Sequence, residues 1–276
     1  MSNLHTGFAE INGATLYYEI AGQGPALVML HGHLLDSRQW DDQFAAFAES
    51  YRVLRYDTRG FGQSSLPPEP YSHAADLYSL LRFLDIEQAY LMGCSGGGAI
   101  CIDFTLQHPQ MVAGLILLGS SLGGYQPTGQ APPKLIAMQA ALQSGDLSQA
   151  VELSLQLFTD GSRRTAQEVN AAARERTRTM SAQLFARPPV PEATPLPIDP
   201  PALERLAEIR VPTLVIVGAE DDQMLHDIAD LIASRVPQAQ KHIIADAGHH
   251  PNLEHPDAFN QMVTAFLDQA QREANA

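Results

Sequence analysis

The chain alternates short apolar runs with segments of helical periodicity, and this alternation constrains its fold more than any other feature. Residues 26–30 (ALVML) form a continuous apolar run, which is typical of a strand buried on both faces of a sheet. Similar β-rich runs occur at 51–57, 89–92, 115–118, 213–217 and 242–245. Helical faces lie between them, as in the set Leu77, Leu80, Leu81 and Leu84. Alternating strands and helices predict an α/β fold with a mostly parallel sheet covered on both sides.

The first two runs depart from this pattern. Residues 9–11 and 15–19 are separated only by Asn12, Gly13 and Ala14. An Asn-Gly pair between two strands favours a two-residue turn in which both residues have positive φ. The sequence therefore predicts an antiparallel hairpin that opens the sheet at one edge.

One long stretch, from 123 to 209, shows no strand pattern. Its helical segments are weakly amphipathic, and seven of the chain's 19 prolines lie between 188 and 201. A proline-rich run of this kind is extended and stiff. Because insertions after strand ends usually lie over the functional site, we expect a helical lid at 123–205. The core domain would then consist of residues 1–122 and 206–276.

Charge argues against several classes of partner. The 276 residues include 31 acidic and 17 basic side chains, so a surface of formal charge -14 should repel nucleic acid and anionic membranes. The apolar runs are too short to cross a bilayer, and the amino terminus lacks the pattern of a signal peptide. We expect a cytoplasmic protein that acts on a small molecule. The sequence leaves its oligomeric state open, with a homodimer as one alternative.

Residues 93–97 (GCSGG) follow the run 89–92 and precede a helical stretch at 99–107. In this context G-x-S-x-G is typical of a nucleophile elbow, a strained strand-to-helix turn that exposes one hydroxyl. Five residues alone fit a plain glycine-rich turn equally well. A phosphate-binding loop is disfavoured, because neither Gly-Lys-Ser/Thr nor G-x-G-x-x-G with a downstream acid is present. Ser95 is the candidate nucleophile.

A serine nucleophile needs a base, and the base needs an acid that orients it. His249 follows the last predicted strand and Asp221 follows the strand at 213–217, so both should lie at the sheet edge that carries Ser95. Asp222 and Glu220 are alternative acids. The order nucleophile, acid, base is that of the α/β-hydrolase fold, which favours the elbow over the plain turn.

Two further features concern the same edge. An oxyanion needs backbone donors, and the N–H groups of Gly96 and His33 are the candidates, with Gly32 permitting close approach. A metal site at His250 and His255 is disfavoured, because no carboxylate or cysteine stands at a spacing that would complete it. We expect neither a metal nor a cofactor.

Five segments in this order resemble the motifs of the α/β-hydrolase superfamily: HGHLLDSRQW, RYDTRGFGQSS, GCSGGG, PTLVIVGAEDD and AGHHPNLEHPDAF. The resemblance covers about residues 10–122 and 205–268. It implies an eight-stranded sheet, and the serine at the elbow argues against the haloalkane dehalogenases and epoxide hydrolases, which use aspartate there.

The resemblance also narrows the chemistry. The carbon–carbon hydrolases of this fold use serine too, but they commonly carry a tryptophan just after the base, where this chain has Pro251. HGHLL and GCSGG are similar to segments of enol-lactonases and cofactor-free haloperoxidase or perhydrolase-type esterases. We therefore expect a hydrolase that cleaves a carboxylic ester or lactone of a small, fairly apolar substrate through an acyl-enzyme on Ser95. A carbon–carbon hydrolase, a perhydrolase and a slow-turnover small-molecule receptor are the alternatives.

Overall fold

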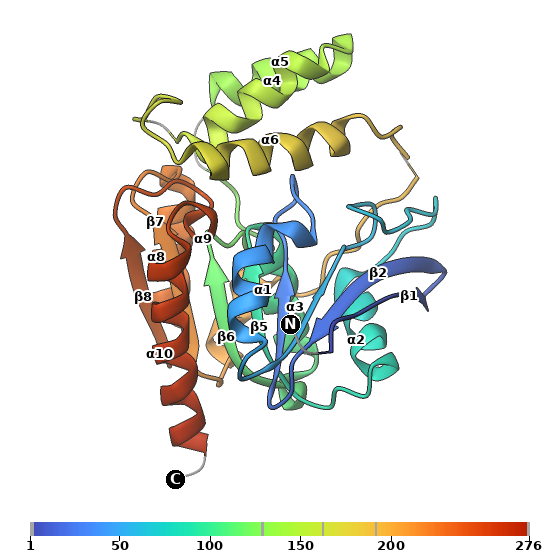
Figure 1. Ribbon diagram of the computed structural model, residues 1–276, viewed down its shortest axis with the longest axis vertical. Helices are drawn as coiled ribbons and strands as arrows, with labels where there is room; N and C mark the ends of the chain where they lie inside the picture. Colours follow the sequence, from blue (N-terminus) through green and yellow to red (C-terminus); the bar gives the residue numbers. More distant parts are fainter. Residues whose placement is uncertain (1–2, 128–129, 162, 191, 275–276) are drawn as a thin grey trace.

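Eight strands form one sheet through the middle of the described chain (Figure 1). The computed structural model describes residues 3–127, 130–161, 163–190 and 192–274. The strands lie in the order β1-β2-β4-β3-β5-β6-β7-β8, and each neighbouring pair from β4 to β8 is parallel. The predicted eight-stranded, mostly parallel sheet is confirmed. The strands are β1 (His5–Ile11), β2 (Ala14–Ala21), β3 (Ala26–Leu30), β4 (Arg52–Tyr56), β5 (Ala89–Cys94), β6 (Val112–Leu118), β7 (Thr213–Gly218) and β8 (Ala239–Ile244).

The predicted hairpin is also confirmed. Strands β1 and β2 pair antiparallel, with Ile11 opposite Ala14. The two turn residues between them, Asn12 and Gly13, have φ values of 48° and 80°. These positive angles match the twist of the flanking strands, which is why an Asn-Gly pair suits this turn.

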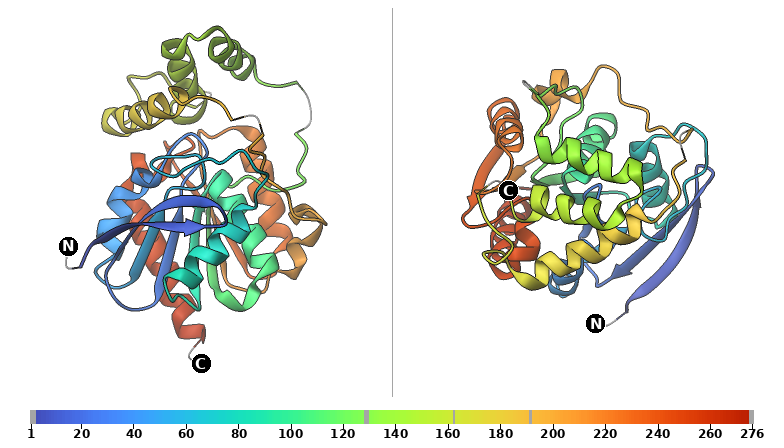
Figure 2. Two further views of the ribbon diagram at one scale, coloured as in Figure 1. Left: turned by 90° about the vertical axis from the view of Figure 1, so that its right-hand side faces the viewer. Right: turned by 90° about the horizontal axis from the view of Figure 1, so that it is seen from above.

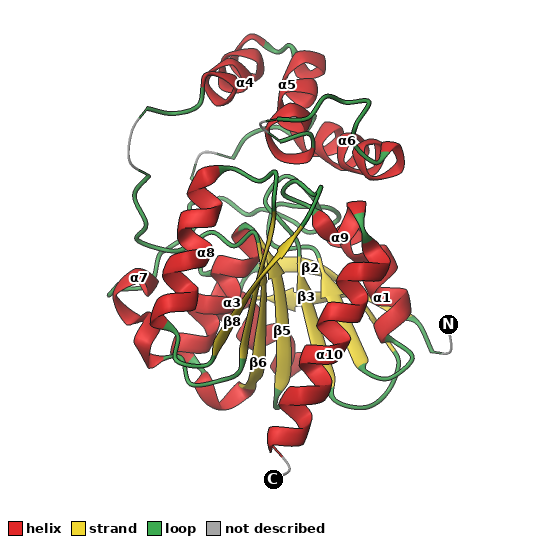
Figure 3. Cartoon of the chain, turned by 90° about the vertical axis from the view of Figure 1, so that its left-hand side faces the viewer, coloured by secondary structure: helices red, strands yellow, loops and turns green. Residues whose placement is uncertain are grey.

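Helices cover both faces of the sheet (Figure 3). In strand β3, Val28 and Leu30 join the core cluster under α2 (His73–Phe83), α3 (Gly96–Gln107) and α8 (Gln223–Arg235). The alternate residues Leu27 and Met29 join the cluster under α1 (Asp41–Phe47) and α10 (Pro256–Ala274). Because successive side chains of a strand point to opposite faces, a strand in a doubly covered sheet is apolar throughout.

Between β6 and β7 the chain forms a separate helical layer. It comprises α4 (Pro133–Ser144), α5 (Leu147–Ser154), the π-helical turn η3 (Leu155–Thr159) and α6 (Ala171–Phe185). Figure 2 shows these helices stacked over one end of the core. No strand lies between 123 and 209 in the described residues of this stretch, in agreement with its sequence pattern. The division into a lid at 123–205 and a core at 1–122 and 206–276 stays a prediction.

Short elements complete the chain: α7 (Ala202–Arg205), α9 (Pro251–Glu254) and the 3-10 turns η1 (Ser37–Trp40), η2 (Pro109–Met111) and η4 (Leu206–Glu208). Among the described helices, none is both long enough and apolar enough to cross a bilayer.

Candidate active site

Ser95 occupies the turn between β5 and α3. Its backbone has φ 52° and ψ -117°, which is a strained conformation for a residue with a side chain. Backbone hydrogen bonds hold it: its N–H donates to Leu118 O at 2.9 Å, and its carbonyl accepts from Ser121 N at 3.0 Å and from Ala99 N at 3.2 Å. A Cβ at Gly93 would collide with Gly97 O, so the turn closes only with glycine there. The local geometry is that of a nucleophile elbow.

The structure brings His249 to Asp221. Nδ1 of His249 lies 2.9 Å from Oδ2 of Asp221, and both side chains are buried. The neighbouring acids have other partners. Asp222 accepts the N–H of Met224 as the N-cap of α8, and Glu220 pairs with the exposed Arg163. Of the three acids suggested by the sequence, Asp221 is therefore the one that contacts the imidazole.

Ser95 and His249 line one cavity of about 290 Å³ together with residues of the inserted helices. In the described part of the chain no hydrogen bond joins the Ser95 hydroxyl to His249. Hydrogen bonds between a nucleophile and its base are often long before substrate binds. The missing hydrogen bond is therefore compatible with a nucleophile and base that line the same cavity. The lining residues are Gly32, His33, Leu34, Ser95, Ser121, Met138, Phe158, Met224, Leu225, His249 and His250.

Two backbone N–H groups, those of Gly96 and His33, are the candidate donors beside Ser95 and this cavity. Gly96 is the first residue of α3, so its N–H has no partner within the helix. The N–H of Gly32 donates to Gln39 Oε1 at 2.8 Å and is occupied, whereas that of His33 has no protein acceptor among the described residues. The N–H groups of His33 and Gly96 thus have no hydrogen-bond acceptor among the described residues, and their role as oxyanion donors stays a prediction.

The side chain of His33 has a place that the sequence did not indicate. Its ring lies against Gly96, where a Cβ would collide with it, and it stacks on Phe61 with centroids 5.8 Å apart. The His33 side chain borders the cavity and is partly exposed to solvent, and desolvation by the surrounding protein, together with nearby His31, lowers the pKa of His33.

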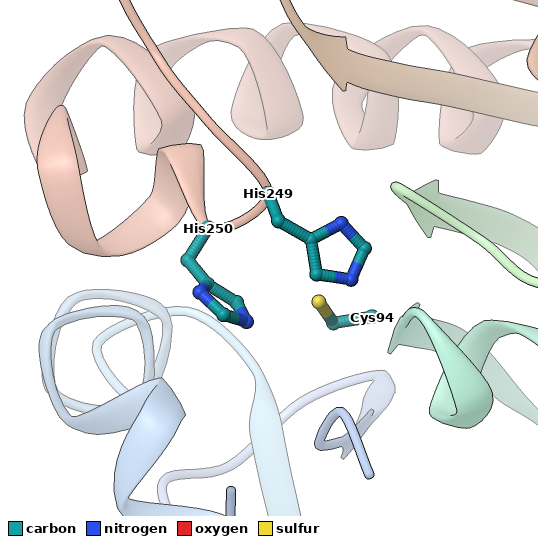
Figure 4. Close-up of side chains that lie close together, drawn as sticks. All are labelled: Cys94, His249 and His250. Carbon is teal, nitrogen blue, oxygen red and sulfur yellow. The ribbon is translucent and has the colours of Figure 1, made fainter. Parts of the chain in front are cut away.

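A cluster of possible metal ligands lies beside the site (Figure 4). Atoms of Cys94, His249 and His250 lie within 4.8 Å of one another, an arrangement that the sequence did not indicate because Cys94 is remote along the chain. Burial raises the pKa of the Cys94 thiol to about 12, so this residue is a poor thiolate ligand and a poor nucleophile. His249 already binds Asp221. We assign no metal here, and the expected absence of a metal stays a prediction.

The comparison with known families decides the family. The model of the Alpha/beta hydrolase family matches residues 27–262. The chain belongs to this family. The hydrolase is 30% identical over 269 residues to a 2-hydroxy-6-oxononadienedioate/2-hydroxy-6-oxononatrienedioate hydrolase of Paraburkholderia xenovorans, with 91% of this chain and 90% of the relative covered.

Two other similar proteins carry different names. A pimeloyl-(acyl-carrier protein) methyl ester esterase of Aeromonas hydrophila is 27% identical, with 89% of this chain and 96% of the relative covered. A solved structure described as an N-acyl homoserine lactone degrading enzyme is 29% identical at a TM-score of 0.74, and the match covers 94% of this chain and 100% of that one. The names of these three proteins differ in substrate.

Proposed function

We propose that this hydrolase cleaves a carboxylic ester or lactone of a small, fairly apolar molecule through an acyl-enzyme on Ser95. The observation that carries the proposal is the buried contact of His249 with Asp221, at 2.9 Å, beside a cavity that Ser95 also lines. A strained serine, a histidine and a carboxylate in this order are the parts that acyl transfer requires.

In the proposed mechanism His249 removes the hydroxyl proton of Ser95 as its oxygen attacks the acyl carbon. Asp221 holds the imidazole and stabilises the positive charge that it gains. The N–H groups of His33 and Gly96 bind the oxyanion of the tetrahedral intermediate. His249 then protonates the leaving alcohol, and a water molecule that His249 activates releases the acid from Ser95.

The cavity wall supports an uncharged substrate. Leu34, Met138, Phe158, Met224 and Leu225 supply its apolar surface. None of the described residues that line it is an arginine or lysine, so a bound carboxylate would have no counter-ion. Carbon–carbon cleavage is the second candidate, because one relative carries that activity in its name. The dioate in that name denotes two carboxylates, which this cavity is poorly built to hold.

We further propose that the inserted helices act as a lid, because Met138 of α4 and Phe158 of η3 reach the cavity that contains Ser95. We place the reaction in the cytoplasm, a location that two unpaired cysteines, Cys94 and Cys101, support.

The proposal is tested by fluorophosphonate labelling followed by turnover measurements on neutral activated esters and on lactones. We expect stoichiometric labelling of Ser95 and many turnovers per labelled site. Stoichiometric labelling with negligible turnover on the whole panel would contradict hydrolysis and support the slow-turnover receptor.

A further inference from the structure

We propose that Arg164 and Glu254 are positioning residues for His249, so that the inserted segment is part of the catalytic scaffold as well as a cover. The proposal rests on the proposed function, because it takes His249 to be the base. It is carried by a continuous set of hydrogen bonds from the end of η3 to the loop that holds His249.

The end of η3 is bound to the base loop directly. The last carbonyls of a helix have no partner within the helix and must find one elsewhere. Here Phe158 O accepts the backbone N–H of His249 at 2.9 Å. The next two carbonyls, of Thr159 and Asp160, accept from Nη2 and Nε of Arg164 at 2.8 and 3.0 Å. The inserted segment thus supplies the acceptor for the backbone of His249 itself.

Arg164 reaches the same loop from the other side. Its guanidinium forms a two-point ion pair with Glu254 at 2.7 and 3.2 Å and also donates to Asp246 O. Glu254 in turn accepts the N–H of Gly248 at 2.7 Å. The consecutive N–H groups of Gly248 and His249 are therefore held by Glu254 and Phe158, and both acceptors depend on the inserted segment.

The ion pair between Arg164 and Glu254 matters for the loop of His249 because it is buried. The side chains of Arg164 and Glu254 are 11% and 2% exposed, so losing either partner leaves a charge enclosed without its counter-ion. The neighbouring Arg163 pairs with Glu220 beside Asp221, but its side chain is 67% exposed. Exposed pairs contribute little, so Arg164 is the residue on which the geometry depends.

A second buried ion pair holds the end of η3, where these hydrogen bonds begin. Arg174 of α6 binds both carboxylate oxygens of Asp160, at 2.8 and 3.0 Å, and also Glu152 of α5 at 2.7 Å. Asp160 therefore joins Arg174 through its side chain and Arg164 through its carbonyl. The connection runs from α6 through the end of η3 to the peptide groups of His249.

A role in folding alone would predict fewer active molecules rather than slower ones, and the test separates these outcomes. Arg164→Met removes the guanidinium, Arg164→Lys keeps the charge but not the fork, and Glu254→Gln keeps an oxygen for Gly248. Arg205→Met is the matched control, because Arg205 forms a pair with the exposed Glu208 on α7 and η4. For each protein, kcat on p-nitrophenyl acetate is divided by the concentration of sites that a fluorophosphonate titrates to completion.

We expect kcat per titrated site to fall by roughly 10²-fold in Arg164→Met, because small displacements of a reacting group have effects of this size. Arg164→Lys and Glu254→Gln should lose less. The double variant Arg164→Met/Glu254→Gln should lose no more than Arg164→Met, since both changes act on one connection. A kcat per titrated site within twofold of the wild type in Arg164→Met, or losses that multiply in the double variant, would overturn the proposal.

Hydrogen exchange provides a readout that needs no turnover. The peptide that spans 247–255 should exchange at least tenfold faster in Arg164→Met than in the wild type, and at the wild-type rate in Arg205→Met. Unchanged exchange would also overturn the proposal. If the wild type hydrolyses no ester, the proposed function fails, and the exchange result still decides whether Arg164 holds the loop of His249.

Discussion

Asp221 touches the two loops that follow the neighbouring strands β7 and β8. Its Oδ2 lies 2.9 Å from Nδ1 of His249, and its Oδ1 accepts the N–H of Asp222 at 2.9 Å. The carboxylate therefore fixes the imidazole while its own orientation is fixed by the adjacent peptide. Asp222 directs its side chain to the start of α8, where it caps the helix.

This difference predicts opposite effects for the two acids. Asp221→Asn should lower kcat by roughly 10³–10⁴-fold, because the amide can favour the wrong tautomer of His249. Asp222→Ala should leave kcat close to the wild type and lower the free energy of unfolding by about 1 kcal/mol through loss of the helix cap. Steady-state kinetics and urea unfolding measure both. The reverse pattern would make Asp222 the acid of the triad.

The contact of the His33 ring with Gly96 predicts a rescue. Gly96→Ala should lower kcat by roughly 10²-fold, because the new methyl displaces the His33 ring and with it the backbone donors of the oxyanion. His33→Ala keeps its backbone N–H and should lose much less. The double variant should recover part of the activity that Gly96→Ala loses. Additive losses in the double variant would show that the ring is not what the methyl displaces.

Replacing Asp103 of α3 with asparagine should raise the free energy of unfolding in a pH-dependent way. Burial raises its pKa from 3.8 to about 6, and its Oδ1 has no hydrogen-bond partner among the described residues. Because the pKa of Asp103 is higher in the folded than in the unfolded state, its ionisation lowers the free energy of unfolding. This loss is absent below pH 3.8 and reaches its full size once the pH has risen through 6. Asp103→Asn should therefore raise the free energy of unfolding by about 1–2 kcal/mol at pH 8, reduced by partial exposure.

The measurement for Asp103 is chemical denaturation at pH 4 and pH 8. The gain should be present at pH 8 and nearly absent at pH 4. Asp230→Asn is the control, because Asp230 forms an exposed pair with Lys241 and should change stability little at either pH. An equal effect of Asp103→Asn at both values would show that charge burial is not its cause.

The apolar cavity predicts selectivity by charge. Neutral p-nitrophenyl butyrate should be hydrolysed at least tenfold faster, in kcat/KM, than a p-nitrophenyl ester of similar length that ends in a carboxylate. Met138→Arg places a cation at the wall and should narrow this difference. A wild-type preference for the charged ester would favour the dicarboxylate chemistry named for one relative.

Most of the fold could be predicted from local patterns in the sequence. Strand β3 was predicted with its observed bounds because it is buried on both faces and therefore apolar throughout. The start of β8 was missed because this edge strand is largely exposed, with Ile243 55% exposed, so its pattern is weak. The sequence also suggested the elbow, because backbone strain and the need for glycine are properties of a few adjacent residues.

Contacts between distant residues could not be predicted in this way. The sequence offered three neighbouring acids for the triad, and only the course of the loop decides which side chain faces His249. The ring of His33 over Gly96 and the carbonyl of Phe158 on His249 join residues from separate elements. The Phe158 contact in particular comes from a weakly amphipathic stretch, where the sequence gives little guidance about packing.

Formation of an acyl-enzyme on Ser95 is tested by combining turnover measurements with intact-protein mass spectrometry. Wild-type protein and Ser95→Ala are each treated with p-nitrophenyl acetate and, separately, with a fluorophosphonate. We expect turnover and a single phosphonyl adduct on Ser95 in the wild type, and neither in Ser95→Ala. Unchanged turnover in Ser95→Ala, or an adduct on another residue such as Cys94 or Ser121, would contradict it.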